Sequence, residues 1–409
     1  MLKIVTRMFL FAALLNCFAT TMAAVATGSP VRIGFDADFT RVGNTAAQEI
    51  ELGIRIAIEE INAGGGVLGG RPVELVIKEN RVNPARSIDN ILEFAEVPDL
   101  VAVFAGRFTP VVIATVKPAH EKKLILLAPW SSGTSVINNG FKPNYAFRLS
   151  LNDLIAIPAM IDRARSIGKP RIGMMVANTA WGRDSREAAE RYVSKSQDVK
   201  IVGVEPHNSR DTAMLTQYKR LIEQGAQAIL LVASDAEAAS FVSQFAALDG
   251  KMRVPLISHW GLTGGSFFST VGGETLARID LSVVQTFSLT RADPRKVKRV
   301  TDIARKIGSP LMPQDIPSPT GFAHAYDLAH ILVRAINIAG STDRSKVRDA
   351  LEQVTNYDGL VRNFARPFTP DNHEALQASD VFFARYRADG ALVPVVQGDG
   401  RANTRIAPK

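Results

Sequence analysis

Hydroxyl side chains gather in one short segment of the chain. Ser131, Ser132 and Thr134 surround Gly133 directly after an apolar stretch, and Thr109 ends another loop. Hydroxyls and free backbone amides that converge in this way suit a carboxylate ligand and need no formal positive charge. The alternative interpretation of the Ser-Ser-Gly-Thr segment is a polar turn without a ligand.

Two arginines add positive charge near the same loops. Arg107 and Arg183 lie in loops that we expect to face each other, so both side chains could reach the same anion. The alternative is that they are solvated, as exposed arginines usually are.

The chain contains three tryptophans, and each follows a short apolar run. Their flat surfaces could stack on an apolar or aromatic ligand, or surround a cationic one, at about 0.5–2 kcal/mol per contact. The alternative is packing in a core or between two lobes. Because all three occupy similar positions after such runs, we expect at least two of them to line a ligand cleft: Trp130, Trp181 and Trp260.

Such loops need a scaffold that brings them together. From residue 31 onward, short apolar runs alternate with longer amphipathic stretches, which is typical of a parallel α/β sheet. Ligands of open parallel sheets bind beyond the carboxyl ends of the strands. The predicted strands span 31–35, 72–78, 101–105, 124–128, 171–177, 201–205, 228–233 and 254–258. The loops that follow them span 36–43, 106–110, 129–134, 178–184, 234–237 and 259–264.

Helices are expected between these strands. Isoleucines at spacings of four, four and three predict one apolar stripe, which consists of Ile50, Ile54, Ile58 and Ile61. A second helix is expected to begin at Asn83, which can cap free amides, with Pro84 in the first turn. The alternation occurs in one block before and one block after about residues 145–150, and residues 278–339 return to helical patterning. The pattern therefore predicts an α/β protein with two lobes.

Composition limits the possible functions. The chain has 409 residues and a formal charge of +8, and 46% of its residues are hydrophobic. At about 100–200 residues per domain, it should form two or three compact units. The basic residues are dispersed, so nucleic acid is not an expected partner.

The amino terminus has the layout of a cleaved secretory signal. Lys3 and Arg7 precede the apolar run 8–15, and Ala23 and Ala26 supply small residues for cleavage. Residues 1–26 are therefore expected to be removed on export to the periplasm. Cleavage would also remove Cys17, the only cysteine; lipid attachment to Cys17 is the alternative.

Motifs for enzymes, metals and cofactors are weak. Residues 64–69 read Gly-Gly-Gly-Val-Leu-Gly, but they follow a predicted helix and precede a strand, the reverse of a dinucleotide site. A helix-terminating turn is the expected structure. The six histidines show no metal-binding spacing, and neither a phosphate-binding loop nor a GxSxG elbow is present. We therefore expect no enzyme activity, metal or cofactor.

Several ordered segments give the chain a resemblance to a known family. They are 31–35, reading VRIGF; 53–70, reading GIRIAIEEINAGGGVLGG; 83–85, reading NPA; 124–132, reading LILLAPWSS; 181–184, reading WGRD; and Asp211 with the following helix. In these segments the chain resembles the leucine/isoleucine/valine-binding family of periplasmic substrate-binding proteins of ABC transporters.

The resemblance implies two Rossmann-like lobes with parallel sheets, joined by a three-strand hinge. The implied boundaries are 27–147 with 288–360 for the first lobe and 148–287 with 361–409 for the second. Thr109, Ser131 and Ser132 correspond to positions that hold a ligand carboxylate, Trp181 to a ligand-facing tyrosine, and Ser234 and Asp235 to a second-lobe contact loop. Trp260 stands where amino-acid-binding members often have an acid, which argues against a simple branched-chain amino acid.

The resulting expectation is a periplasmic receptor, not an enzyme. It captures a small organic solute and delivers it to the ABC permease subunits of the inner membrane. The expected protein is a monomer. Its expected ligand is amino-acid-like or a carboxylate with an aromatic or apolar body, and a quaternary ammonium solute is second. The alternative function is a sensing module that signals to a membrane kinase or chemoreceptor.

Overall fold

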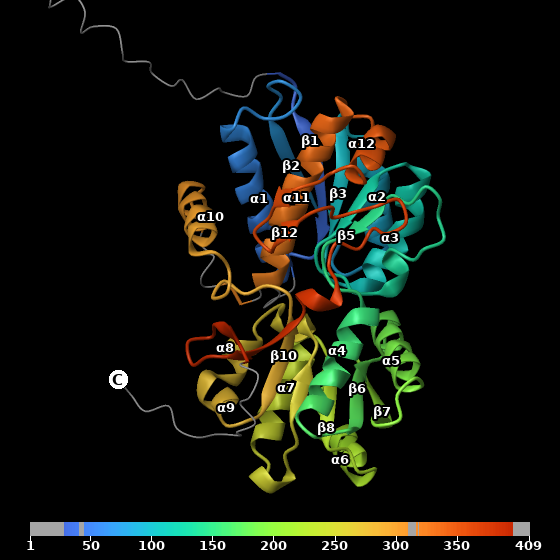
Figure 1. Ribbon diagram of the computed structural model, residues 1–409, viewed down its shortest axis with the longest axis vertical. Coiled ribbons are helices and arrows are strands. Elements are labelled where there is room, and N and C mark those ends of the chain that lie inside the picture. Colours follow the sequence, from blue (N-terminus) through green and yellow to red (C-terminus); the bar gives the residue numbers. More distant parts are fainter. Residues whose placement is uncertain (1–27, 41–44, 310–315, 318, 396–409) are drawn as a thin grey trace, which may run out of the picture.

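Two α/β lobes lie one above the other in the computed structural model (Figure 1). The structure describes residues 28–40, 45–309, 316–317 and 319–395. The predicted signal, residues 1–26 with Cys17, lies outside the described residues. No helix among the described residues is long and apolar enough to cross a membrane.

The first lobe contains a five-stranded sheet in which all strands are parallel. Its order is β2-β1-β3-β4-β5. The bounds are β1 Val31–Ala37, β2 Val73–Glu79, β3 Leu100–Ala105, β4 Ile125–Ala128 and β5 Ala146–Arg148. Successive side chains of a strand point to opposite faces, so β3 places Val103 in one apolar cluster and Phe104 in the other.

Helices cover both faces of this sheet. Helices α2 (Pro84–Ala95) and α3 (Thr109–Glu121) pack together on one face, and α1 (Ala46–Ala63) packs against α11 (Pro319–Ala339) on the other. The α11 helix also packs against α12 (Arg344–Leu351), while α10 (Pro294–Lys306) packs beside α1. After α12, β11 (Tyr357–Asp358) and β12 (Asn363–Phe364) form a two-stranded sheet. The chain then returns to the second lobe.

The second lobe contains a seven-stranded sheet with the order β14-β13-β10-β9-β8-β6-β7. Its parallel strands are β6 Arg171–Ala177, β7 Lys200–His207, β8 Ala228–Val232, β9 Leu256–Ser258 and β10 Leu281–Gln285; β13 Phe382–Tyr386 and β14 Leu392–Pro394 are antiparallel additions at one edge. Its helices are α4 Asp153–Ser166, α5 Ala180–Val193, α6 Leu215–Glu223, α7 Asp235–Ala246, α8 Phe267–Val271 and α9 Gly273–Ala277.

The local sequence signals at two helix ends have their expected effects. The side chain of Asn83 accepts hydrogen bonds from the amides of Ala85 and Arg86 and so caps α2. The glycine-rich segment ends α1, and Gly65 and Gly66 adopt positive φ angles of 98° and 76° that favour glycine. The interpretation of this segment as a helix-terminating turn is confirmed.

Some sequence-based expectations need correction. The run 278–339 is not helical throughout, because it contains β10. All five residues of this strand are buried, and such a short apolar run cannot be distinguished from part of a helix by periodicity. The expectation of parallel strands also fails at the edge of the second sheet. There, β13 returns from the distant carboxyl-terminal part of the chain and pairs antiparallel with β10.

The chain passes between the sheets three times: from β5 to α4, from β10 to α10, and from β12 to β13. The first and third passages lie side by side, since Arg148 donates its amide to His373 and its carbonyl accepts the amide of Ala375, both at 2.9 Å. The expected fold class, two lobes joined by a three-strand hinge, is confirmed.

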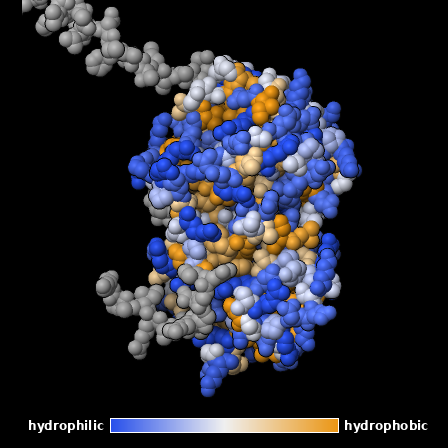
Figure 2. Space-filling view, in the orientation of Figure 1, coloured by the Kyte–Doolittle hydropathy of each residue, from blue (hydrophilic) through white to orange (hydrophobic). Residues whose placement is uncertain are grey.

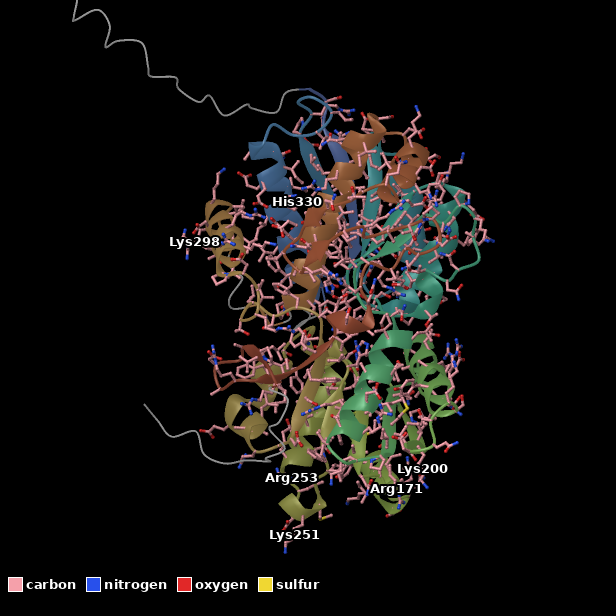
Figure 3. The ribbon with its side chains drawn as sticks, viewed as in Figure 1. Arg171, Lys200, Lys251, Arg253, Lys298 and His330 are labelled. Atoms are coloured by element: carbon pink, nitrogen blue, oxygen red, sulfur yellow. The ribbon has the colours of Figure 1, made fainter. Side chains whose placement is uncertain are left out.

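The surface of the molecule separates polar and apolar regions. On the face in Figure 2, apolar residues gather around the boundary between the lobes, and hydrophilic residues cover much of each lobe. The labelled basic residues in Figure 3 lie away from that boundary, with Lys298 on α10 and Arg171, Lys200, Lys251 and Arg253 at the far end of the second lobe.

Candidate functional site

The carboxyl ends of the parallel strands in both lobes face the boundary between the lobes. Several polar contacts cross it. The Ala46 amide donates to the Gly264 carbonyl oxygen at 3.1 Å, the Thr134 amide donates to Asp184 at 2.9 Å, the Asp153 amide donates to the Ser132 carbonyl oxygen at 3.1 Å, and Arg107 pairs with Asp235. The structure therefore holds the lobes against each other, with the predicted loops between them.

On the first lobe, the hydroxyl groups predicted to bind a carboxylate are buried together. Thr109 Oγ1 and Ser131 Oγ lie 3.0 Å apart, and Ser132 is also buried. Thr109 is the first residue of α3 rather than a loop residue, so its amide has no intrahelical acceptor. The next residue is Pro110, which has no amide hydrogen, and the amides of Val111 and Val112 both donate to the Phe108 carbonyl oxygen at 3.0 Å. The hydroxyls are therefore the main groups of this cluster that can donate hydrogen bonds to a carboxylate.

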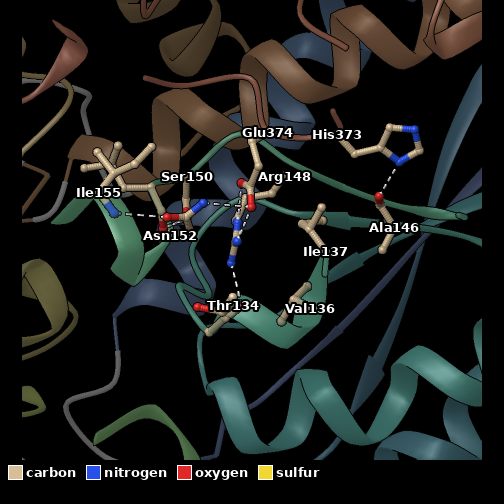
Figure 4. A network of polar contacts seen from close by, with 12 residues as sticks. Thr134, Val136, Ile137, Ala146, Arg148, Ser150, Asn152, Ile155, His373 and Glu374 are labelled. Atoms are coloured by element: carbon tan, nitrogen blue, oxygen red, sulfur yellow. Dashed lines mark hydrogen bonds and ion pairs between the residues drawn. The ribbon is translucent and has the colours of Figure 1, made fainter. Parts of the chain in front are cut away.

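A buried arginine, Arg148, holds the loop that carries Ser131 and Ser132, which we call the hydroxyl loop. Arg148 Nη1 donates to the carbonyl oxygens of Ser131 and Gly133 at 3.1 and 2.8 Å, while its Nε donates to Glu374 at 2.7 Å (Figure 4). Asn152 Nδ2 donates to the same carboxylate at 3.0 Å. This network fixes the loop and links the first passage between the lobes to the third.

Arg107 and Asp235 form an ion pair across the boundary. Arg107 Nη2 and Asp235 Oδ1 lie 2.7 Å apart, and the two side chains are only 5% and 8% exposed. Arg107 Nε is buried and has no hydrogen-bond partner among the described residues. Asp235 is the first residue of α7, where a negative charge is favoured by the helix dipole. The pair joins one predicted site residue from each lobe.

An aromatic cluster forms the second-lobe side. The His259 ring stacks on Trp260, with centroids 3.7 Å apart, and meets Trp181 edge-on at 4.9 Å. The Gly261 amide donates to His259 Nδ1 at 3.1 Å, so in the neutral ring Nε2 carries the proton. That atom faces Asp153 Oδ1 at 3.3 Å. His259 thus orients both indoles, and Trp181 Nε1 is a buried donor without a partner in the described structure.

Trp130 differs from the other two tryptophans in its surroundings. A Cβ added to Gly321 on α11 would lie 2.5 Å from the indole, and one added to Gly264 of the opposite lobe would lie 3.1 Å from it. Trp130 is 4% exposed. In this structure the indole fills space between the lobes. This is the alternative role that the sequence allowed for a tryptophan, namely packing between two lobes.

The other predicted residues have distinct positions. Thr134 begins the short helix η2 (Thr134–Val136), and Ser234 immediately precedes α7. Trp181 and Arg183 lie in the first turn of α5 rather than in the predicted loop, because α5 begins at Ala180. Arg183 is exposed and forms no hydrogen bond or ion pair with the other ten predicted residues. The structure brings the rest together at the boundary, whereas Arg183 remains exposed.

Sequence reasoning missed the residues that support this site. His259 stands next to Trp260 and Asp153 begins α4, but no motif indicates that the two side chains meet. Arg148 ends the three-residue β5, which has no clear strand signal, and its partner Glu374 lies 226 positions away. Only the folded chain shows these contacts.

Two cavities border the boundary. The larger, of about 160 Å³, is lined by residues of both lobes: Thr134, Ser135, Asn138, Leu154, Asp184, Glu187, Ala188 and Arg191. The smaller, of about 10 Å³, lies beside Arg107, Phe108 and Asn80. Burial raises the pKa of Asp184 at the larger cavity. Among the described residues, no group of three or more His, Cys, Asp or Glu could hold a metal ion.

His324 is buried and contacts a residue on each side of the boundary region. Its Nδ1 lies 2.9 Å from the Pro129 carbonyl oxygen and its Nε2 lies 2.9 Å from Thr286 Oγ1. Burial lowers the pKa of His324 to about 4. Since the unfolded chain binds this proton more readily, the neutral histidine's contribution is complete above pH 6.5 and is lost as the pH falls towards 4.

We expect this histidine alone to lower the free energy of unfolding by about 3 kcal/mol between pH 7.5 and pH 4. Urea denaturation of the wild type and of His324→Gln at several pH values isolates the effect. The difference between the two proteins should change with pH over this range. A constant difference would contradict the role of His324.

The two facing α/β lobes and the polar and aromatic residues between them define a two-lobed binding protein. The chain belongs to the periplasmic binding protein family, whose model matches residues 30–391. No curated protein sequence matches it significantly.

Solved structures share the fold at low sequence identity. A periplasmic binding protein type 1 from Bordetella pertussis Tohama I is 20% identical with a TM-score of 0.79, and the match covers 90% of this chain and 100% of that one. A branched-chain amino acid transporter substrate-binding protein from Streptococcus pneumoniae, in complex with isoleucine, is 18% identical with a TM-score of 0.72 and coverage of 90% and 100%. A solute-binding protein of an ABC transporter from Rhodopseudomonas palustris, in complex with p-hydroxybenzoic acid, is 18% identical with a TM-score of 0.74 and coverage of 90% and 95%.

Proposed function

We propose that this protein is the periplasmic solute-binding receptor of an ABC importer. The observation that carries the proposal is the meeting of buried polar and aromatic side chains from both lobes at their boundary, above all the pairing of Arg107 with Asp235. Buried polar groups and unpartnered donors in a region between two lobes are typical of a ligand site. Membership of the periplasmic binding protein family supports the same function.

The proposed mechanism is capture by closure. The first lobe receives the solute through Thr109, Ser131 and Ser132, and the second lobe completes the enclosure with Trp181 and Trp260. A ligand shifts the open and closed populations only by binding the closed state better. Contacts to both lobes provide that difference. The energy for transport comes from separate subunits, because this chain serves only as the receptor.

The proposed ligand is an amino-acid-like solute or a carboxylate with an aromatic or apolar body. The hydroxyl cluster can hold its carboxylate, and Trp181 Nε1 offers another buried donor. The indoles and the His259 ring can contact its body. Isoleucine and p-hydroxybenzoic acid, bound by two proteins of this fold, are both small carboxylates. A quaternary ammonium solute would use the aromatic surfaces instead.

We further propose lobe boundaries of 27–147 with 288–360 and 148–287 with 361–409. The end of β5 at Arg148 and the return of β13 to the second sheet support the division in outline, while the pairing of β11 with β12 moves the third crossing from residue 360 to a point after Phe364. Residues 1–26 would direct export to the periplasm, where the monomeric protein meets the inner-membrane permease subunits. Nucleic acid is not a proposed partner, and the function requires no cofactor or catalytic activity.

The alternative function is a sensing module that signals to a membrane kinase or chemoreceptor. Solute-dependent closure of the lobes could be recognised by such a sensor as well as by a permease. Genes for a permease and an ATPase beside the coding sequence would support transport. A neighbouring histidine kinase gene would support sensing.

Mass spectrometry of small molecules that copurify with the protein is the most direct test. A thermal-shift panel of carboxylates, amides and betaines then ranks the ligand classes, and recovery of the bound compound unchanged after long incubation tests the absence of turnover. Binding that survives methyl esterification and does not respond to salt would contradict carboxylate recognition. No binding by any member of the panel, together with no copurifying solute, would contradict the receptor function.

The aromatic cluster gives a second prediction. Replacing Trp181 or Trp260 singly with Ala should weaken solute binding about tenfold or more, if each indole contributes roughly 1.4 kcal/mol. Isothermal titration calorimetry measures the change, and Phe variants at the same positions should retain part of the affinity. Wild-type affinity in both Ala variants would exclude a ligand role for these indoles.

A further inference from the structure

One turn of the second lobe is contacted by several parts of the first lobe. This turn comprises η4 (Trp260–Thr263) and Gly264, which follows it. The Gly264 carbonyl oxygen accepts a hydrogen bond from the Ala46 amide at 3.1 Å. A Cβ on Gly264 would lie 2.3 Å from Arg107 Nη1 and 3.1 Å from Trp130 Cζ2. Three separate segments of the first lobe therefore converge on Gly264.

The backbone at Gly264 does not itself require glycine. Its φ angle is −80°, which residues with side chains readily adopt. What excludes a side chain is the close approach of the opposite lobe. Because Arg107 and Trp130 belong to the first lobe, a methyl group at position 264 would be obstructed only when the lobes meet.

Neither neighbour can move aside without losing another contact. Arg107 Nη2 is held by Asp235 at 2.7 Å, so a displaced guanidinium would disrupt this ion pair. The indole of Trp130 is confined on another side by Gly321, at which an added Cβ would lie 2.5 Å from the ring. A side chain at position 264 would therefore either break the ion pair or separate the lobes.

Gly261 in the same turn provides an informative contrast. A Cβ there would meet Trp181 Cη2 at 2.6 Å and the Ala233 carbonyl oxygen at 3.0 Å, both within the second lobe. Gly261 thus allows the aromatic cluster to pack inside its own lobe, whereas Gly264 allows the other lobe to approach.

We propose that Gly264 is a positioning residue that sets the stability of the closed state, and with it the affinity for every solute. The inference rests on the proposed capture of a solute by closure. Gly264 acts through lobe contact, so its replacement should weaken chemically different ligands by the same factor. A residue that touches the ligand would affect each ligand differently.

The test compares Gly264→Ala with Gly250→Ala. Gly250 is an exposed glycine with negative φ whose added Cβ would approach only the end of the Arg253 side chain, at 3.3 Å. We expect Gly264→Ala to reduce affinity about tenfold or more, which corresponds to about 1.4 kcal/mol, for all solutes that bind the wild type. The thermal unfolding midpoint without solute should stay close to that of the wild type. Unchanged affinity, or losses that differ widely among solutes, would overturn the proposal.

A residue-specific measurement separates this inference from the receptor function. Ala46 is the first residue of α1, so its amide has no intrahelical acceptor, and slow hydrogen exchange there would report its contact with Gly264. We expect protection of this amide in the wild type and in Gly250→Ala, and its loss in Gly264→Ala. If no solute binds, the receptor function fails while this readout still tests the contact. No protection in the wild type, with or without solute, would overturn the inference.

A double-mutant cycle tests the stated cause. In an Arg107→Ala/Asp235→Ala background the nearest obstructing atom is gone and no unpaired carboxylate is buried on closure, so adding Gly264→Ala should reduce closure, measured as Ala46 protection, much less than it does in the wild type. Equal reductions in both backgrounds would contradict the steric explanation and overturn the proposed role.

Discussion

Replacing Arg148 with Ala is expected to lower the free energy of unfolding by about 3–5 kcal/mol, the cost of breaking a buried ion pair from one side. The Arg148 side chain is completely buried, and its partner Glu374 is 16% exposed. The substitution leaves this carboxylate without its cation and removes the donor to the Ser131 and Gly133 carbonyl oxygens. The hydroxyl loop should lose its fixed position as well.

Urea denaturation measures this change, with Arg186→Ala as the matched control. Arg186 pairs with Glu190 on the exposed face of α5, where both side chains are more than half exposed, so its loss should cost no more than about 0.5 kcal/mol. Arg148→Lys should recover only part of the stability, since one ammonium cannot reproduce the paired contacts of a guanidinium. Equal effects of Arg148→Ala and Arg186→Ala would show that the network has no special role.

Replacing Arg107 with Ala is expected to weaken solute binding about thirtyfold or more, which corresponds to roughly 2 kcal/mol. In the closed arrangement Asp235 is 8% exposed and depends on Arg107 for compensation of its charge. Closure of the variant would bury an unpaired carboxylate. The penalty applies when the lobes meet, so it should appear in affinity more than in the stability of either lobe.

The variant Arg107→Ala/Asp235→Ala distinguishes two roles of Arg107. If Arg107 acts by neutralising Asp235, the double variant should bind more tightly than Arg107→Ala, because no unpaired charge is then buried. If Arg107 instead contacts the solute, the second substitution should restore nothing. Calorimetric titration of the three proteins measures the difference, and wild-type affinity in Arg107→Ala would contradict both roles.

Features that depend on residues close together in the sequence were predicted correctly more often than features that depend on distant residues. The eight predicted strands are present because each is a short run rich in apolar and β-branched residues, and the cap at Asn83 depends on amides two and three residues away. The strands β5 and β14, of three residues each, were not among the predicted strands, whereas the equally short β9 was recognised within the run 254–258. The strand β10 was not predicted, because it lies in the run 278–339, which was expected to be helical.

The sequence by itself determined the two-lobed α/β class and the loops that meet at the boundary, because hydrophobic periodicity and strand-end position are local properties. The family followed from the resemblance of ordered segments such as 53–70 and 124–132. Only the tertiary structure decided which side chains meet. It paired Arg107 with Asp235 across 128 positions and Arg148 with Glu374 across 226, and it left Arg183 exposed. These outcomes depend on how two separately folded surfaces fit together, and side-chain packing across such a boundary has no sequence periodicity.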